Sequence, residues 1–318
     1  MPIALFVGRR LAALVATLLI SSVAIYGALA IAPGDPAASL AGGSLPNPQA
    51  LAQIRAEYHL DDPFWTQYWQ WLSGLLHGDL GRSIVFRSDV ADLLSGRIAN
   101  TLLLVAYAAT LIVVAGVGLG LLAALRGRRV NQLVTVATTV AMGAPTFVMA
   151  IVLIWIFSTK LSWFPVYGSG DGLADKLWHL TLPAVALSCT WVAYVSQVTR
   201  ASVAGELRSE HVETARGRGL PNAAIVRHHV LRNAAGPILA VSGLTVAGLF
   251  AGTAVAEQAF GVNGIGSLLI ESAAKQDLAV VQILALLMVG AFVVVNTVVD
   301  VATALLDPRL AERQGATA

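Results

Sequence analysis

The sequence predicts an all-α membrane protein that crosses the bilayer with six helices. Of its 318 residues, 57% are hydrophobic and only 12% are charged, whereas an ordinary soluble domain is about a quarter charged. The mean hydropathy is +0.74, and the apolar residues gather in long runs separated by polar segments. Lys and Arg concentrate in alternate polar segments, as expected of a chain that crosses a membrane repeatedly.

Six apolar segments are long enough to span a bilayer, which takes about 20 helical residues. The first, Leu11 to Ala32, follows Arg9 and Arg10. A signal peptide is the alternative for this segment, but its apolar core exceeds the roughly 7–15 residues of a signal, so we expect an uncleaved helix. The other expected spans are Asn100–Leu125, Leu133–Ser158, His179–Thr199, Ile238–Ala256 and Leu278–Leu305.

The distribution of basic residues predicts the orientation of these spans. With the N-terminus inside, thirteen of the twenty Lys and Arg residues fall in cytoplasmic segments and seven in outer segments. Cytoplasmic loops carry the excess of Lys and Arg in membrane proteins. We therefore expect a multi-pass protein of the cell (plasma or inner) membrane with both termini and the polar segment 200–237 in the cytoplasm.

The segment between the first two spans is expected to lie outside the cell. Pro33 and Pro36 should end the first helix, because proline cannot continue a helix. Gln49–Leu60 and Phe64–Leu76 read as two short amphipathic helices. The second of them gathers its large apolar residues on one face, which is typical either of a helix lying in the lipid headgroup region or of a docking surface for an external binding protein. These residues are Trp65, Tyr68, Trp69, Leu72, Leu75 and Leu76.

Small residues and one proline predict how the middle spans pack. Gly116 and Gly120 lie four positions apart in the second span, as do Gly248 and Gly252 in the fifth. Such pairs usually mark close packing of helices rather than a pore. In the third span, the Gly143-Ala144-Pro145 sequence should kink the helix.

Two carboxylates stand near the ends of predicted spans. Glu257 closes the fifth span, and Asp300 lies near the inner end of the sixth, beside Asn296. An ionisable group inside a membrane suggests function, although one near the interface can instead reach water or a cation. The candidates for a role in translocation or in packing are therefore Gly143, Pro145, Glu257, Asn296 and Asp300.

The segment from Arg200 to Pro237 is the longest polar interruption in the second half of the chain. Its pattern predicts one helix from Ser202 to Arg218 and a second from Ala223 to Ala235. Gly219 stands where the first helix should end in a left-handed cap, and Pro221 suits the first turn of the next. Two short helices that meet at a glycine would form an angled protrusion, small enough to enter a groove on another protein.

Part of this loop carries a family signature. Glu213-Thr214-Ala215, three further residues and then Gly219 resemble the EAA…G motif of permease subunits of ATP-binding cassette (ABC) importers. Thr214 replaces the middle alanine, and the family's later Ile-x-Leu-Pro is not kept at positions 229–232. Stretches elsewhere resemble the dipeptide, oligopeptide and nickel branch of these permeases, namely 61–63, 78–83, 231–234, 257–266 and 307–309.

This resemblance implies the type I ABC importer permease fold in three parts. Residues 1–98 would hold the N-terminal span and the extracytoplasmic segment, 99–306 the core permease domain, and 307–318 a cytoplasmic tail. The loop would be the coupling helix that docks on a separate ATPase, through Glu213, Thr214, Ala215, Arg216 and Gly219. In that role Glu213 supplies polar anchoring, Ala215 close approach and Gly219 the bend.

The resemblance also implies partners and cargo. The partners would be a second homologous permease, two ATP-binding subunits, an extracytoplasmic substrate-binding protein and membrane lipid. The chain itself would need no cofactor, since ATP and Mg would bind to the ATPase subunits. Di- or oligopeptides would be the cargo, with nickel, glutathione or oligosaccharide as alternatives.

Missing motifs narrow the function further. The sequence contains no G-x-x-x-x-G-K-[ST] phosphate loop, so it is not expected to hydrolyse ATP or to be an enzyme. Its six histidines form no convincing metal-ligand set, and no basic-aromatic surface suggests nucleic acid. Two rivals stay open: a secondary transporter that uses Asp300 or Glu257 for ion coupling, and an intramembrane enzyme.

Overall fold

The computed structural model describes residues 3–31, 48–57, 61–83 and 85–306. The proposed tail 307–318 and the Pro33–Pro36 break lie outside these residues. The described part contains helices and loops but no β-strand, which confirms the all-α prediction. Its helices are α1 (Ile3–Ile31), α3 (Pro48–Glu57), α4 (Phe64–Leu76), α5 (Val90–Leu94), α6 (Arg97–Leu111), α7 (Val117–Leu125), α8 (Arg128–Gly143), α9 (Thr146–Leu153), α10 (Gly172–Glu206), α11 (Glu210–Gly217), α12 (Asn222–Ile225), α13 (Leu231–Phe260), α14 (Ile265–Ala274) and α15 (Leu278–Leu306).

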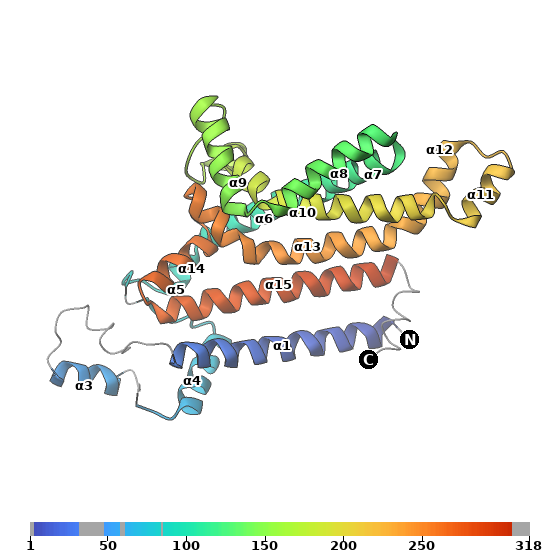
Figure 1. Cartoon of the computed structure of the whole chain (residues 1–318). Coiled ribbons are helices and arrows are strands. Elements are labelled where there is room, and N and C mark those ends of the chain that lie inside the picture. Colours follow the sequence, from blue (N-terminus) through green and yellow to red (C-terminus); the bar gives the residue numbers. More distant parts are fainter. Residues whose placement is uncertain (1–2, 32–47, 58–60, 84, 307–318) are drawn as a thin grey trace.

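Long helices form a bundle in which α10 is central (Figure 1). It packs against α6, α7, α8, α9 and α13, while α15 lies between α13 and α1. The start of α1, the α7–α8 connection and the α11–α12 region lie at one end of the bundle, and α3, α4, α5 and α14 lie at the other (Figure 1). We call these the knob end and the α14 end.

Among the described residues, five helical segments are long and apolar enough to cross a membrane, and the α8–α9 pair makes a sixth if that bent pair counts as one span. The helices extend beyond the expected spans: α1 includes Arg9 and Arg10, and α10 runs for 35 residues through Pro183. The predicted kink at Gly143 to Pro145 is present as a full break. There the pair α8–α9 is bent by 107°, so the span expected over Leu133–Ser158 is divided between two helices at the predicted place.

The glycines of the second span let α7 lie directly on α10. A Cβ atom built on Gly116 would stand 2.9 Å from Cβ of Val195, and one on Gly120 would stand 2.6 Å from the carbonyl oxygen of Ser196. Real Cβ atoms do not approach other atoms so closely, so both positions need a residue without a side chain. A π-helical turn at Ile112–Gly116 joins α6 to α7 at this crossing.

At the α14 end, α4 occupies the predicted residues Phe64–Leu76 and is anchored on α1 by aromatic contacts. The ring of Tyr26 packs edge-on against Phe64 and Tyr68, with centroids 5.5 and 5.6 Å apart. The buried hydroxyl of Tyr68 lies 2.8 Å from the hydroxyl of Ser22. Tyr68 therefore faces inward, while Trp65 and Trp69 stay 58% and 61% exposed. The residues predicted to form one apolar face are thus partly buried against α1 and partly exposed.

Candidate functional site

The loop predicted to couple to an ATPase forms a compact protrusion, which we call the knob (residues 207–225). It begins where α10 ends at Glu206. Ser209 turns the chain, with its hydroxyl donating to the carbonyl of Glu206 at 2.6 Å, and α11 starts at Glu210. The predicted single helix from Ser202 to Arg218 is therefore wrong, because the chain breaks at 207–209.

Packing beneath α11 explains this break. Val212 is completely buried and Ala215 is 4% exposed, and both belong to a small apolar cluster with Val203, Ile225 and Val230. A straight continuation of α10 would carry Val212 and Ala215 away from these partners into water. The fold-back buries this apolar surface, which is favourable by about 25 cal/mol per Å².

Gly219 ends α11 as the sequence predicted. Its φ angle is +75°, in the left-handed region that residues with a Cβ atom rarely adopt. The Gly219 amide donates to the carbonyl of Arg216 at 2.9 Å, and the Leu220 amide donates to that of Ala215 at 3.3 Å. These two bonds form a Schellman motif, which satisfies the last carbonyls of the helix.

The chain then rejoins the bundle without forming a separate second helix. Pro221 directly precedes α12 (Asn222–Ile225), and a π-helical turn at Val226–Val230 leads into α13. The expected helix Ala223–Ala235 is thus only the start of one long helical segment that ends at Phe260. Pro237 lies inside α13, which packs on α10 and α15.

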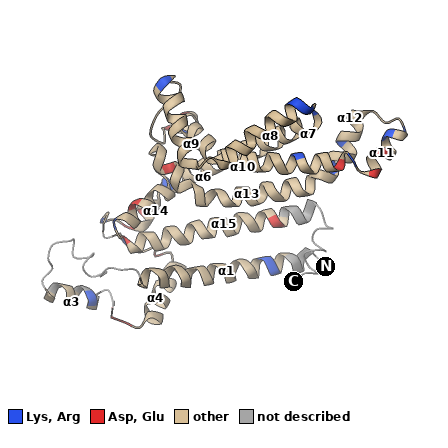
Figure 2. Ribbon diagram, viewed as in Figure 1, with Lys and Arg blue, Asp and Glu red and all other residues tan. Residues whose placement is uncertain are grey.

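The outer surface of the knob is polar. Glu213, Thr214 and Arg216 are exposed, and neither the Glu213 carboxylate nor the Arg216 guanidinium has a hydrogen-bond or ion-pair partner among the described residues. Two acidic residues occupy the first turn of α11 and one basic residue its last turn, which complements the helix dipole. The surface therefore leaves charges of both signs available to another molecule (Figure 2).

Ala215 lies on the opposite side of α11 from these charges. It is buried against the bundle, so its small side chain lets α11 lie close to its own chain. His211 also ties the knob down. Its Nε2 atom lies 3.1 Å from the Asn233 amide nitrogen of α13 and 3.4 Å from a Glu206 carboxylate oxygen of α10.

Glu257 lies at the α14 end, far from the knob, and is fully buried. One carboxyl oxygen accepts a 2.6 Å hydrogen bond from the Thr101 hydroxyl of α6, and the other accepts the Ser267 amide of α14 at 2.8 Å. The Thr101 hydroxyl in turn accepts the Ile265 amide at 2.9 Å. Glu257 therefore joins α6, α13 and the start of α14, which the sequence did not reveal.

The other candidates lie in different parts of the fold. Asp300 of α15 forms a 2.9 Å ion pair with Arg10 of α1, and Asn296 lies one turn away on α15, half-buried. Gly143 ends α8 and Pro145 precedes α9, so both belong to the break in the bundle. The structure thus brings together the five knob residues but not the five residues proposed for translocation or packing.

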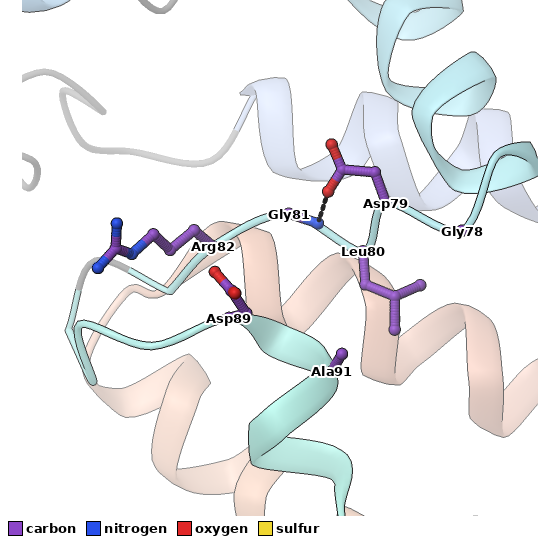
Figure 3. Close-up of a pocket in the computed structure, with 7 residues that line it drawn as sticks. All are labelled: Gly78, Asp79, Leu80, Gly81, Arg82, Asp89 and Ala91. Atoms are coloured by element: carbon purple, nitrogen blue, oxygen red, sulfur yellow. Dashed lines mark hydrogen bonds between the residues drawn. The ribbon is translucent and has the colours of Figure 1, made fainter.

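A pocket of about 340 Å³ opens at the α14 end around the stretch 78–83 (Figure 3). Gly78 and Gly81 line it at positive φ angles of 86° and 78°, and Asp79 accepts the Gly81 amide at 2.9 Å. Ser83 donates to Asp277 just before α15. Sequence reasoning used this stretch only as a family marker and did not predict the pocket.

Comparisons with known proteins identify the family. Residues 116–312 match the family described as the binding-protein-dependent transport system inner membrane component, and residues 3–104 match its N-terminal counterpart. The first match alone covers more than half of the chain. The chain belongs to this family. It is therefore the membrane permease component of a binding-protein-dependent ABC importer, and the resemblance seen in the sequence is confirmed.

Relatives of this permease match along almost their whole length. A probable peptide ABC transporter permease of Sinorhizobium fredii is 35% identical over 309 residues, which are 96% of this chain and 98% of that protein. A glutathione transport system permease of Escherichia coli strain K12 is 34% identical over 306 residues, with the same coverage.

A solved structure supports the type I importer permease fold. The crystal structure of an amino acid ABC transporter with histidines superposes with a TM-score of 0.52. The match covers 69% of this permease and 94% of that chain, at 20% sequence identity. At this level of identity the likeness concerns the fold alone.

Proposed function

We propose that this permease forms half of the translocation path for di- or oligopeptides in an ATP-driven importer. A second, homologous permease supplies the other half. An extracytoplasmic binding protein delivers the solute, and two ATPase subunits bind ATP and Mg on the cytoplasmic side. ATP-driven closure of the ATPases moves the knob, and the bundle rocks between inward-facing and outward-facing states.

The observation that carries this proposal is the two-sided construction of α11. Its inner side is fixed to the bundle through Val212, Ala215 and His211, so a force on the knob passes directly to α10 and α13. Its outer side presents Glu213 and Arg216 without partners in the described chain. Charged groups of this kind form hydrogen-bonded pairs across interfaces and fix the register of a partner.

The names of the relatives support peptides as the cargo. One relative is named for peptide transport and the other for glutathione, which is itself a tripeptide. Both solutes carry amide groups and ionised ends. Nickel and oligosaccharides are the alternative cargoes, and they would be separated from peptides by transport assays with the cognate binding protein.

The geometry gives less support to an ion-coupled secondary transporter. Asp300, one candidate for ion coupling, is paired with Arg10 at the α1–α15 contact. Glu257, the other, has both oxygens occupied by donors of α6 and α14. Asp300→Asn should therefore leave ATP-driven transport largely intact, whereas it would abolish ion dependence in a secondary transporter.

Copurification tests the proposed partners and the knob together. The tagged permease, extracted from its host membrane, should bring down two ATPase subunits and a second permease. Glu213→Arg should weaken ATPase binding without affecting insertion, because this exposed side chain makes no hydrogen bond or ion pair in the described chain. Gly219→Val and Ala215→Arg should abolish coupled transport.

Glu271→Arg is the control, since Glu271 is also a helical glutamate, with 42% of its side chain exposed, but belongs to α14 at the opposite end of the bundle. Normal ATPase binding and coupled transport by the Glu213→Arg and Gly219→Val variants would remove the coupling role of the knob. A permease that moves solute alone in liposomes without ATP would instead establish the secondary transporter.

A further inference from the structure

Uncharged polar side chains line the uncovered sides of α8 and α10 where these two helices meet. Three of them, Asn131, Thr135 and Thr139, recur every four residues along α8, so they lie on one helical face. On α10, Thr190, Tyr194 and Gln197 also share one face, and all six are half-buried or exposed. We call these six residues the polar strip.

Contacts between α8 and α10 join the polar residues of the two helices. The side-chain nitrogen of Gln197 lies 3.4 Å from the hydroxyl oxygens of Thr138 and Thr139. At the other end, the Thr190 hydroxyl lies 3.3 Å from the carbonyl oxygen of Ala144, which belongs to the α8–α9 break. The polar strip therefore runs from this break toward the knob end, where α8 begins (Figure 1).

Several polar groups of the strip have no hydrogen-bond partner among the described residues. They are the Asn131 side-chain nitrogen, the Tyr194 hydroxyl and the Gln197 side-chain oxygen. The Thr135 and Thr139 hydroxyls differ, because they donate to acceptors on their own helix. A hydroxyl that is satisfied in this way can lie in lipid at little cost. Amide and phenol groups left without partners in hydrocarbon are costly, so this face should contact water or another polar molecule.

The opposite side of α8 has the composition that suits lipid or an apolar protein surface. Leu133 and Val140 are 72% and 68% exposed there. A single helix thus offers a polar face and an apolar face at the same depth. The contrast indicates that only the polar side borders an aqueous space.

The strip itself carries no formal charge, and the nearest charged residues along α8 and α10, Arg129 and Arg200, lie at its knob end. Residues 130–159 and 180–199 contain no Asp, Glu, Lys, Arg or His. A surface of amide and hydroxyl groups can donate and accept hydrogen bonds but does not select for the charge of a solute. This chemistry matches a peptide backbone, whose amide and carbonyl groups are the same for every side chain.

We propose that the polar strip lines the solute path between the α8–α9 break and the knob end and binds the peptide backbone by hydrogen bonds, without selection for charge. This inference rests on the proposed function, because it assigns residues to the path of that importer. It makes Gln197 and Tyr194 solute-contacting residues and gives the break at Pro145 a place at one end of the path.

Thiol labelling tests whether the strip faces water. The single Cys189 is replaced by serine, and cysteines are placed at Thr139 or Tyr194 and, as matched controls on the apolar side, at Leu133 or Val140. The assembled transporter in proteoliposomes is treated with a charged methanethiosulfonate reagent, which reacts with the ionised thiol and so needs water. The strip cysteines should react at least about ten times faster than the controls.

Similar labelling rates on both sides of α8 would overturn the inference. The result is independent of the proposed function, because labelling requires no transport. Reactive strip cysteines in a complex that moves no peptide would leave the strip in place and refute the proposed importer. Normal peptide transport with unreactive strip cysteines would refute the strip alone.

A charge placed in the strip tests contact with the solute. Gln197→Glu and Gln197→Lys are compared for transport of Ala-Lys-Ala and Ala-Glu-Ala, with Gln197→Met as the uncharged control. The ratio of kcat/KM for the two peptides should shift several-fold in opposite directions in the two charged variants and stay unchanged in the control. Equal losses for both peptides in both charged variants would show a structural role only and overturn the assignment.

Discussion

At the scale of single residues, Glu257 has the largest predicted effect on stability. Its two oxygens accept hydrogen bonds from Thr101 and Ser267 inside the bundle. Glu257→Gln keeps the volume but turns an NH₂ group toward one of these donors, so a buried donor loses its acceptor. We expect a loss of about 2 kcal/mol, measured as the change in unfolding free energy of the purified permease in detergent.

Glu271→Gln is the control for this change. Glu271 pairs with Lys275 at 2.7 Å, but both side chains are more than 40% exposed, and such surface pairs contribute roughly 0–1 kcal/mol. Gly264→Ala should resemble Glu257→Gln, because a Cβ atom at Gly264 would overlap the Glu257 carboxyl group. Equal losses of unfolding free energy in the Glu257 and Glu271 variants would contradict a stabilising role for the buried hydrogen bonds of Glu257.

Two neighbouring glycines of the knob give a second residue-scale prediction. Gly219 has a φ of +75°, whereas Gly217 is helical, and a Cβ atom on either would meet nothing within 4 Å. Gly219→Ala should therefore cost about 1–2 kcal/mol through backbone strain alone, and Gly217→Ala should be neutral or stabilising. Hydrogen exchange at the Leu220 amide, which donates to Ala215, reports the difference.

Acceleration of this exchange by about ten-fold in Gly219→Ala corresponds to roughly 1.4 kcal/mol. Equal exchange in the two alanine variants would mean that the Schellman turn does not hold the knob. The left-handed turn itself could be predicted from the Gly-x-Pro pattern, because it depends on neighbouring residues. The partner of Glu257 could not be predicted, since Thr101 lies 156 positions away in the sequence.

At the scale of elements, the two exposed tryptophans of α4 raise the question of which side of this helix contacts lipid. Trp65 and Trp69 lie on one side, and the polar Thr66 and Gln70 are also exposed. We expect the tryptophan side to lie in the headgroup region, because amphipathic aromatic rings favour that position. Spin labels on cysteines at positions 65 and 69 should be more accessible to oxygen than to a water-soluble nickel complex, with the reverse at 66 and 70.

Equal access of the nickel complex to all four positions would favour a water-exposed face, as needed for docking of an external protein. In that case Trp65→Ala with Trp69→Ala should weaken binding of the substrate-binding protein. Contact between these labels and lipid would leave the docking surface to other parts of the α14 end.

Element boundaries show where local patterns stop being informative. The bounds of α4 could be predicted because a proline precedes the helix and its apolar spacing is continuous. The Ser202–Arg218 helix could not, since spacing alone does not show that Val212 packs back on Val203. The same limit applies to α8 and α9: Pro145 predicts a kink, but the 107° angle depends on the neighbouring helices.

At the scale of the whole molecule, composition predicts the helical membrane class, and the spacing of apolar runs predicts most of the spans. The sequence does not show which helix is central or which helix faces remain uncovered, because both depend on contacts among distant segments. The polar strip illustrates this limit. Its members on α8 and α10 are at least 51 positions apart, from Thr139 to Thr190, and become neighbours only in the bundle.

Orientation of the whole permease gives the last prediction. The knob and the basic α7–α8 connection lie at the same end of the bundle (Figure 2), and cytoplasmic ends of membrane proteins carry such a basic excess. Green fluorescent protein fused after residue 318 should fluoresce, and alkaline phosphatase fused there should be inactive. The opposite results are expected for fusions truncated after Gln276, between α14 and α15, which serve as the control.

An active phosphatase at the C-terminus would place α11 outside the cell, because α15 and the α11–α13 segment have their knob ends on the same side (Figure 1). No ATPase subunit could then reach Glu213, so the coupling role of the knob would fail while the fold and the family stayed unchanged. Fluorescence at the C-terminus together with phosphatase activity at Gln276 would put the knob where ATP is available, as coupling requires.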